Sequence, residues 1–176
     1  EGQAKPIGLR LPQAEVARHV TLRLSVEPTE VMPSVWTTGE ISQRLDFEGR
    51  SVHHYIRVGE TWQADPYRDD LSLVLQTSQG LVVVCGCCHA GLMNTLAHVR
   101  GHFKGPIQAI IGGTHLASAG PEILSHVVTE LNNISQGSAP NLYLNHCTGE
   151  RAQVALAQAF STKVNPCPAG TVLMFD

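Results

Sequence analysis

From Asp70 onward, short apolar runs alternate with segments of helical periodicity, and this alternation limits the available folds more than any other feature. Leu71–Thr77 and Leu81–Cys85 are apolar, β-branched runs joined by Ser78-Gln79-Gly80, which predicts a hairpin. The other predicted elements are helices at Ala90–Arg100 (closed by Gly101), Pro121–Gln136 (ended by Gly137) and Glu150–Phe160 (Thr148 as cap), and strands at Ile107–Ile111, Asn141–Asn145 and Thr171–Phe175. This order predicts a layered α/β domain.

The first 69 residues are less regular. Apolar residues alternate with polar ones from Val20 to Val26, which predicts a half-buried strand. Val31–Trp36 predicts another strand, interrupted by Pro33. The stretch Thr37–Asp69 is rich in glycine and polar residues, and it predicts loops and short strands.

Size and composition favour one globular domain over residues 1–176. The chain is 43% apolar and 15% charged, with 12 basic and 15 acidic side chains and a net charge of −3. The absence of a basic stripe argues against a nucleic-acid partner. Apolar runs such as Gly80–Cys85 are too short to span a membrane, and no secretory signal is visible. Five cysteines, an odd number with three crowded together, predict free thiols and a cytoplasmic location.

Three histidines occupy equivalent places in this pattern. His89, His115 and His146 each come shortly after a predicted strand, beside glycine. If the three strands are parallel neighbours, their carboxyl ends share one rim, where α/β sheets bind ligands. One strand-end histidine is more often a hydrogen-bonding loop residue than a ligand, but three in equivalent places favour a site.

Neutral imidazole is a common ligand of zinc and similar ions, so the three histidines predict a metal site. Asp69 and Asp70, just before the predicted hairpin, are candidate carboxylate ligands or second-sphere partners of a ligating histidine. The remaining histidines (His19, His53, His54, His98, His102, His126) are predicted to lie on the surface or on helix faces, with His53-His54 left open as site residues.

The neighbouring cysteines leave a second chemistry open. Cys87 and Cys88, next to His89, could supply a thiol nucleophile activated by imidazole, or a thiolate that binds or supports the metal. Cys85 ends its strand and is predicted to lie in the core. Gly112-Gly113-Thr114 could cradle an anion at a helix start, but it matches neither dinucleotide nor P-loop spacing.

Five motifs resemble, in the same order, a branch of the metallo-β-lactamase superfamily that includes dihydropterin ribofuranosylaminobenzene phosphate synthases and metal-dependent hydrolases. They are Trp36-Thr37-Thr38-Gly39-Glu40-Ile41, Asp69-Asp70, Gly86-Cys87-Cys88-His89-Ala90-Gly91, Gly112-Gly113-Thr114-His115-Leu116 and His146-Cys147-Thr148-Gly149. The resemblance runs from about Trp36 to the end of the chain. Any one of these motifs is moderate support, whereas five in order are strong.

The resemblance implies an αββα sandwich with one or two metal ions at the sheet edge, where a zinc-like ion generates hydroxide from bound water. It assigns His89 and His146 as metal ligands and places His115 at the site, as a ligand or as a substrate contact. Cys88 stands where the family pattern has a small residue such as serine. Zinc, manganese and iron are the candidate metals.

The sequence departs from the family at one large point, because the opening His-x-His-x-Asp-His motif is absent. We therefore expect an N-terminally incomplete sandwich that binds at most one metal per chain and forms a homo-oligomer or pairs with a complementing N-terminal segment. The first hypothesis is a metal-dependent hydrolase of a small molecule. The alternatives are a non-catalytic or partner-completed ligand-binding relative, and a cysteine-dependent enzyme centred on Cys87 or Cys88.

Overall fold

The computed structural model describes residues 5–45, 47–50, 53–134 and 139–176. The strands in chain order are β1 (Thr29–Met32), β2 (Val35–Thr37), β3 (Tyr55–Val58), β4 (Thr61–Ala64), β5 (Ser72–Thr77), β6 (Gly80–Cys85), β7 (Ile107–Gly112), β8 (Asn141–Leu144) and β9 (Val164–Pro166). The helices are α1 (Gln13–Val16), α2 (Leu92–His102), α3 (Pro121–Ile134) and α4 (Glu150–Phe160), with 3₁₀ turns η1 (His146–Thr148) and η2 (Ser161–Lys163). The predicted α/β class is confirmed.

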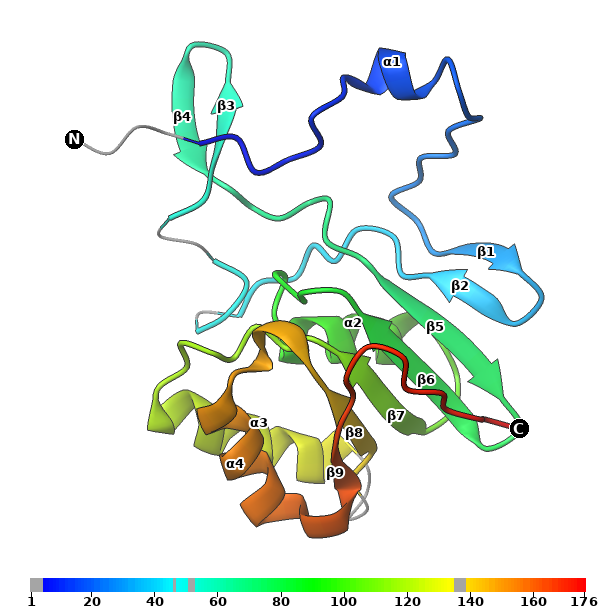
Figure 1. Cartoon of the computed structure of the whole chain (residues 1–176), viewed down its shortest axis with the longest axis vertical. Helices are drawn as coiled ribbons and strands as arrows, with labels where there is room; N and C mark the ends of the chain where they lie inside the picture. Colours follow the sequence, from blue (N-terminus) through cyan, green and yellow to red (C-terminus); the bar gives the residue numbers. More distant parts are fainter. Residues whose placement is uncertain (1–4, 46, 51–52, 135–138) are drawn as a thin grey trace.

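The main sheet has seven strands in the order β1-β2-β5-β6-β7-β8-β9. Strands β5 and β6 form the predicted antiparallel hairpin, and β6, β7, β8 and β9 run parallel to one another. Parallel strands need crossover connections, and α2, α3 and α4 supply them in turn. The carboxyl ends of β6, β7 and β8 therefore lie at one edge of the sheet, as predicted (Figure 1).

One face of the sheet packs against the helices. Val83, Ile110 and Leu142 are paired across β6, β7 and β8, and all three are almost fully buried. They share one apolar core with Leu96 of α2, Leu131 of α3 and Leu156 of α4. A continuous core of this kind holds the strand ends in fixed register, which is what a functional site at the rim requires.

The opposite face of the sheet is apolar and, apart from the buried Val82 and Ala109, only half-buried. Leu73, Leu75, Val84, Ile111 and Tyr143 alternate with the helix-facing residues and point to this side. The C-terminal segment crosses it, with the Phe175 and Tyr143 rings in edge contact at 6.3 Å (Figure 1). The backbone N–H of Ser78 donates to the backbone oxygen of Asp176, which holds the end of the segment beside the β5–β6 turn.

The segment before β2 contains one wrong strand prediction. Val20–Val26 forms no strand, and Val20, Leu24 and Val26 are more than half exposed. Alternation predicts a strand only where a neighbouring strand and a buried face exist, and none lies beside this segment among the described residues. The predicted Val31–Trp36 strand is instead the hairpin β1–β2, which turns at Pro33-Ser34. The expected short strands in 37–69 are present as the β3–β4 hairpin, which lies apart from the main sheet (Figure 1).

The predicted last strand at Thr171–Phe175 is also wrong. The strand that pairs with β8 is β9, which follows directly on α4 and η2. β9 precedes Thr171–Phe175 in the chain, and the backbone N–H of Cys167 extends the pairing of β9 with β8 by donating to Leu144 O. Val172 and Met174 are 81% and 88% exposed, so the alternation at Thr171–Phe175 buries little.

The bounds of α2 and the cap of α4 differ from the predictions in detail. Gly101 lies inside α2, which ends at His102 because the Phe103 N–H closes the helix on Val99 O. Gly149, not Thr148, precedes the first residue of α4, and no side chain caps that helix. The predicted end of α3 at Gln136-Gly137 lies outside the described residues. Among the described residues, no helix is long and apolar enough to cross a membrane.

Candidate metal centre

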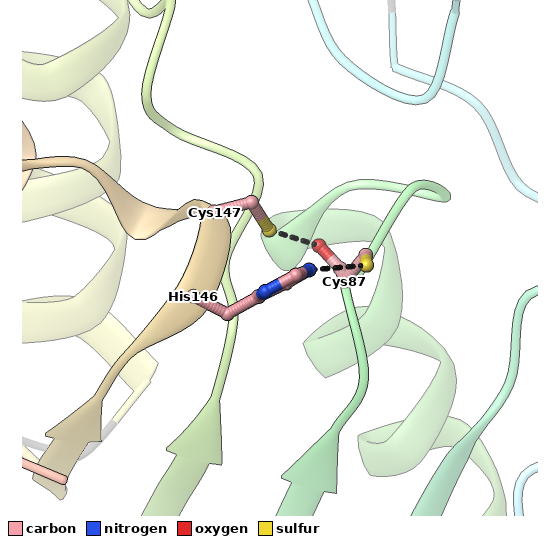
Figure 2. Close-up of side chains that lie close together, drawn as sticks. All are labelled: Cys87, His146 and Cys147. Atoms are coloured by element: carbon pink, nitrogen blue, oxygen red, sulfur yellow. Dashed lines mark hydrogen bonds between the residues drawn. The ribbon is translucent and has the colours of Figure 1, made fainter. Parts of the chain in front are cut away.

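Three strand ends bring the candidate residues together. Cys85, Gly112 and Leu144, at the ends of β6, β7 and β8, stand level in the sheet register. The residues that follow each strand therefore leave the sheet at the same height, and the loops converge at its edge (Figure 2). This convergence is what the histidine pattern predicted for His89, His115 and His146.

The closest group of metal-binding atoms combines His146 with two cysteines. Cys87 Sγ lies 3.0 Å from His146 Nε2, and Cys147 Sγ donates to the carbonyl oxygen of Cys87 at 3.1 Å (Figure 2). The two sulfur atoms and one ring nitrogen of His146 all lie within 4.8 Å of one another. Cys87 and Cys147 are half-buried and His146 is exposed, so solvent reaches the group from the histidine side. Soft sulfur and borderline nitrogen donors are the set that zinc prefers in proteins.

A second group forms around His89. The rings of His89 and His115 lie 4.7 Å apart in an edge arrangement, and the Tyr67 ring lies 4.9 Å from His89. His54 joins from the segment before β3, with its ring 5.9 Å from His89 and its Nδ1 2.8 Å from the Tyr67 hydroxyl. His54 was predicted to be a surface residue with its role left open, and the structure brings it to the site.

The backbone at the site adopts conformations that side chains rarely take. Tyr67, Cys88, His115 and His146 have φ of 50°, 61°, 53° and 49°, in the left-handed region. Each such residue costs roughly 1–2 kcal/mol relative to the right-handed form, and strained residues of this kind gather at functional sites. At these four positions the fold keeps an unfavourable backbone conformation that orients the side chains at the rim.

The surroundings shift two protonation equilibria at the site. Desolvation, followed by the nearby His89 and His54, lowers the pKa of His115 below its ordinary value of 6.5, so at neutral pH its ring is a neutral donor. Desolvation raises the pKa of the Cys147 thiol above its ordinary value of 9.0. The Cys147 sulfur therefore carries a proton in the metal-free protein, consistent with its hydrogen bond to Cys87 O.

Cys88 is unsuited to the nucleophile role that was open for it. Its side chain is 1% exposed, and its sulfur lies 3.4 Å from the hydroxyl of Thr95. Its hydrogen bond to Cys85 and its burial raise the pKa of the Cys88 thiol well above the ordinary value. A buried, protonated thiol neither reaches a substrate nor attacks one. Cys85 is buried in the core, as predicted.

The two aspartates take different positions. Asp70 Oδ2 accepts a hydrogen bond from the Ala90 N–H at 2.8 Å, so this carboxylate anchors the loop that presents His89. Asp69 is exposed. The Gly113 N–H donates to Gly86 O and is already used, and α3 begins several residues further on, at Pro121. Gly112-Gly113-Thr114 therefore does not form the anion cradle at a helix start that its glycines could have indicated.

The N-terminus of α2 already has a carboxylate partner. Glu48 Oε1 accepts a hydrogen bond from the Asn94 N–H at 2.6 Å, at the first turn of the helix. A carboxylate at this position complements the helix dipole and satisfies free amide groups. Desolvation raises the pKa of Glu48 above its ordinary value of 4.5, with the helix N–H groups opposing the shift. The helix that follows the His89 loop is thus anchored by a segment far away in the sequence.

The predicted residues therefore fall into two neighbouring groups. His146 lies with Cys87 and Cys147, whereas His89 and His115 lie with Tyr67 and His54. In the described part of the chain, the three histidines alone do not bring three ligand atoms within 4.8 Å of one another. Sequence reasoning missed Cys147 and Tyr67. Cys147 could have been found from its position directly after His146 in the same strand-end motif. The sequence around Tyr67 gives no such signal.

Comparisons with known proteins agree with the fold and the motifs. The chain is 27% identical over 158 residues to the 7,8-dihydropterin-6-methyl-4-(β-D-ribofuranosyl)-aminobenzene-5'-phosphate synthase of Methanocaldococcus jannaschii, an alignment that covers 86% of this chain and 52% of that protein. It superposes with a TM-score of 0.81 and 26% identity on a crystal structure of a metal-dependent hydrolase of the β-lactamase superfamily, over 93% of this chain and 62% of that one. No protein-family model matches the chain.

These similarities confirm the resemblance in both sequence and fold. The α/β architecture is similar to that of a β-lactamase-superfamily structure, and the similar synthase has the name of the branch whose motifs the sequence resembles. One relative is a synthase and the other a hydrolase, so they share a fold and differ in named activity. The chain spans about half the length of the synthase that it matches, 52%, and 62% of the hydrolase structure.

Proposed function

We propose that this chain is the C-terminal part of a metallo-β-lactamase-type hydrolase that acts on a small molecule with the help of one divalent metal ion. The observation that carries the proposal is the convergence of imidazole and sulfur donors from three adjacent strand ends on one rim. The similarity to a metal-dependent hydrolase of the same fold supports it.

The donors fit a zinc-like ion, with manganese and iron as the other candidates. In the proposal, His146 and His89 bind the metal, and His115 either joins them or contacts the substrate. When bound, the metal supplies a hydroxide from water and polarises the scissile group. Asp70 holds the Ala90 amide and so fixes the direction of the His89 loop. Tyr67 and His54, hydrogen-bonded to each other beside His89, limit the movement of its ring.

The substrate proposed is a small molecule with a phosphate, pterin-like or lactone-like group. The similar synthase is named for a compound with a dihydropterin and a ribofuranosyl phosphate, and this supports the proposed substrate class. The half-buried apolar face of the sheet supports a further proposal, that a second β-layer completes the sandwich there. A complementing N-terminal segment or a second copy of the chain would supply that layer.

A cysteine-based reaction remains the second candidate because one observation favours it. Cys87 Sγ lies 3.0 Å from His146 Nε2, the separation of a thiol activated by imidazole. The two candidates differ in their response to chelation. A metal-dependent hydrolase loses activity toward a chromogenic phosphodiester or lactone on treatment with chelator, whereas a Cys87 enzyme keeps it and loses it to iodoacetamide.

The central experiment compares thermal melts of the parent and His146→Ala with chelator and with zinc. At a zinc concentration about 100 times Kd, binding stabilises the parent by about 2.7 kcal/mol, or roughly 5–10 °C for a chain of this size. A tenfold loss of affinity lowers this gain to about 1.4 kcal/mol. Because His146 is exposed, its removal leaves no buried polar group, and both proteins should melt alike under chelator.

His19→Ala is the matched control, because His19 is exposed and lies near α1, outside the rim. It should melt like the parent in both conditions. If zinc stabilises the parent and His146→Ala equally, His146 is not a ligand and the proposed metal site at this rim is wrong.

A further inference from the structure

We propose that Cys87 and Cys147 are themselves metal ligands, and that their thiolates hold a thiophilic ion together with His146. The inference deepens the proposed function and rests on it for the presence of a metal. It differs in the donor set, because two sulfurs complete the site beside His146. In this donor set His89 is not a ligand, and His89, His115, His54 and Tyr67 form a separate group at the same rim.

The distances are close to those that one zinc ion imposes. With Zn–S of about 2.3 Å and Zn–N of about 2.0–2.1 Å, tetrahedral geometry separates nitrogen and sulfur by about 3.6 Å and two sulfurs by about 3.8 Å. In the structure, Cys87 Sγ and His146 Nε2 are 3.0 Å apart, and all three ligand atoms lie within 4.8 Å. The adjustment needed is therefore about 0.6 Å for the first pair, at most about 1 Å for the two sulfurs and at most about 1.2 Å for Cys147 Sγ and the His146 nitrogen, within the reach of side-chain rotation.

The surrounding backbone is shaped for the two sulfurs. A Cβ at Gly113 would lie 2.8 Å from Cys147 Sγ and 3.4 Å from Cys87 Cα. The residue just past β7 is thus a glycine, at the point where a side chain would occupy the space of the Cys147 sulfur. The Cys147 thiol now donates to Cys87 O, and the Cys87 sulfur meets the His146 ring. Both sulfurs are thus directed into one small volume by contacts that a metal would replace.

The donor set also selects the ion. Two thiolates and one imidazole favour zinc, cobalt or cadmium over magnesium, calcium and manganese, which prefer oxygen. Three protein ligands leave a fourth position for water, as in catalytic zinc sites. That position opens on the exposed side, where His146 reaches solvent.

The test uses cobalt(II) as a probe, with the reduced protein kept under a non-thiol reductant. Thiolate ligation gives a sulfur-to-cobalt charge-transfer band in the near ultraviolet, which imidazole and carboxylate ligands do not give. We expect the band in the parent, about half of its intensity in Cys87→Ser and in Cys147→Ser, and none in the double variant. Cys167→Ser is the matched control, since Cys167 is a buried cysteine outside the group, and it should keep the full band.

A second measurement needs no variant and so does not depend on variant folding. Zinc should protect Cys87 and Cys147 of the parent from iodoacetamide, as read by mass spectrometry of the peptides, and chelator should restore their reaction. Cobalt binding without the charge-transfer band would overturn the thiolate proposal and leave the proposed function standing. Absence of any cobalt or zinc binding would overturn both. A Cys87–Cys147 disulfide that persists under the reductant would also overturn the thiolate proposal.

Discussion

Gly113 couples the fold to the candidate site, and replacing it by alanine tests that coupling. The residue is buried just past β7, and its φ lies outside the left-handed region, so the cost of a side chain there is steric. An added Cβ would lie 2.7 Å from Gly86 O and 2.8 Å from Cys147 Sγ. Both approaches are shorter than van der Waals contact, and the first is to backbone, which cannot rotate away.

The expected loss of stability follows from two contributions. Overpacking of a close-packed region costs about 1–3 kcal/mol. Moving Gly86 O away weakens the hydrogen bond that it accepts from the Gly113 N–H at 3.0 Å, worth about 0.5–1.5 kcal/mol. The sum, about 1.5–4.5 kcal/mol, lowers the melting temperature of a chain of this length by roughly 3–18 °C.

The assay is thermal denaturation followed by circular dichroism, in the presence of chelator so that metal binding plays no part. Gly86→Ala is the matched control, because it stands opposite Gly113 and a Cβ there meets nothing within 4 Å. If Gly113→Ala melts within about 2 °C of Gly86→Ala, the tight approach of the β6, β7 and β8 ends is not what the structure indicates, and the steric part of the metal-site reasoning fails with it.

Two further predictions concern α2, the helix behind the His89 loop. Gly101 is exposed near the end of α2, and a methyl group added there would meet nothing within 4 Å. Gly101→Ala should therefore stabilise the protein by about 0.5–1 kcal/mol and raise its melting temperature by a few degrees. A lower melting temperature would contradict the helical assignment of Gly101. Because desolvation raises the pKa of Glu48 above 4.5, its protonation favours the folded state, and this contribution is present below pH 4.5 and is lost as pH rises through the folded pKa. The unfolding free energy of Glu48→Gln, measured by urea titration, should therefore rise relative to that of the parent as the pH is raised above 4.5. A difference between the two proteins that stays constant with pH would contradict the prediction.

The central sheet could be predicted from the sequence because its signals are local. Buried parallel strands appear as unbroken apolar runs, and Leu81–Cys85 and Ile107–Ile111 were found almost to the residue. The turn Ser78-Gln79-Gly80 marked the hairpin, and α4 was predicted with its observed bounds. Each of these elements buries its apolar residues against neighbours that are close in the chain.

Two alternating segments misled the prediction because alternation does not reveal whether a partner exists. Val20–Val26 has no strand beside it in the described structure. Val164–Pro166, and not Thr171–Phe175, pairs with β8. Val164–Pro166 is closer to α4 in the chain than Thr171–Phe175 is, so a shorter connection has to be ordered when it pairs with β8. A strand of three residues with one apolar member could not be recognised from its own composition.

At the site, the sequence could place the histidines on one rim but could not say which of them meet. Their positions follow from strand ends, which periodicity reveals. Their directions follow from left-handed backbone at His115 and His146, which no pattern of residue types encodes. Tyr67 and His54 reach His89 from the segment before β5, through contacts that depend on how long loops fold back. The cysteine partners of His146 were visible as neighbours in the motifs, yet their convergence needed the register of β6, β7 and β8.

That register gives the two groups at the rim different physical roles. Cys87 and Cys147 follow β6 and β8, which flank β7, and Gly113, just past β7, leaves room for the Cys147 sulfur. A side chain at position 113 would occupy the space of the Cys147 sulfur and so disturb the group that Cys147 forms with Cys87 and His146. The His89 group is held differently, by aromatic contacts with Tyr67 and by the Asp70 carboxylate on Ala90 N–H. The first group is therefore set by the sheet and should resist changes in the loops, whereas the second should respond to changes in the segment that carries His54 and Tyr67.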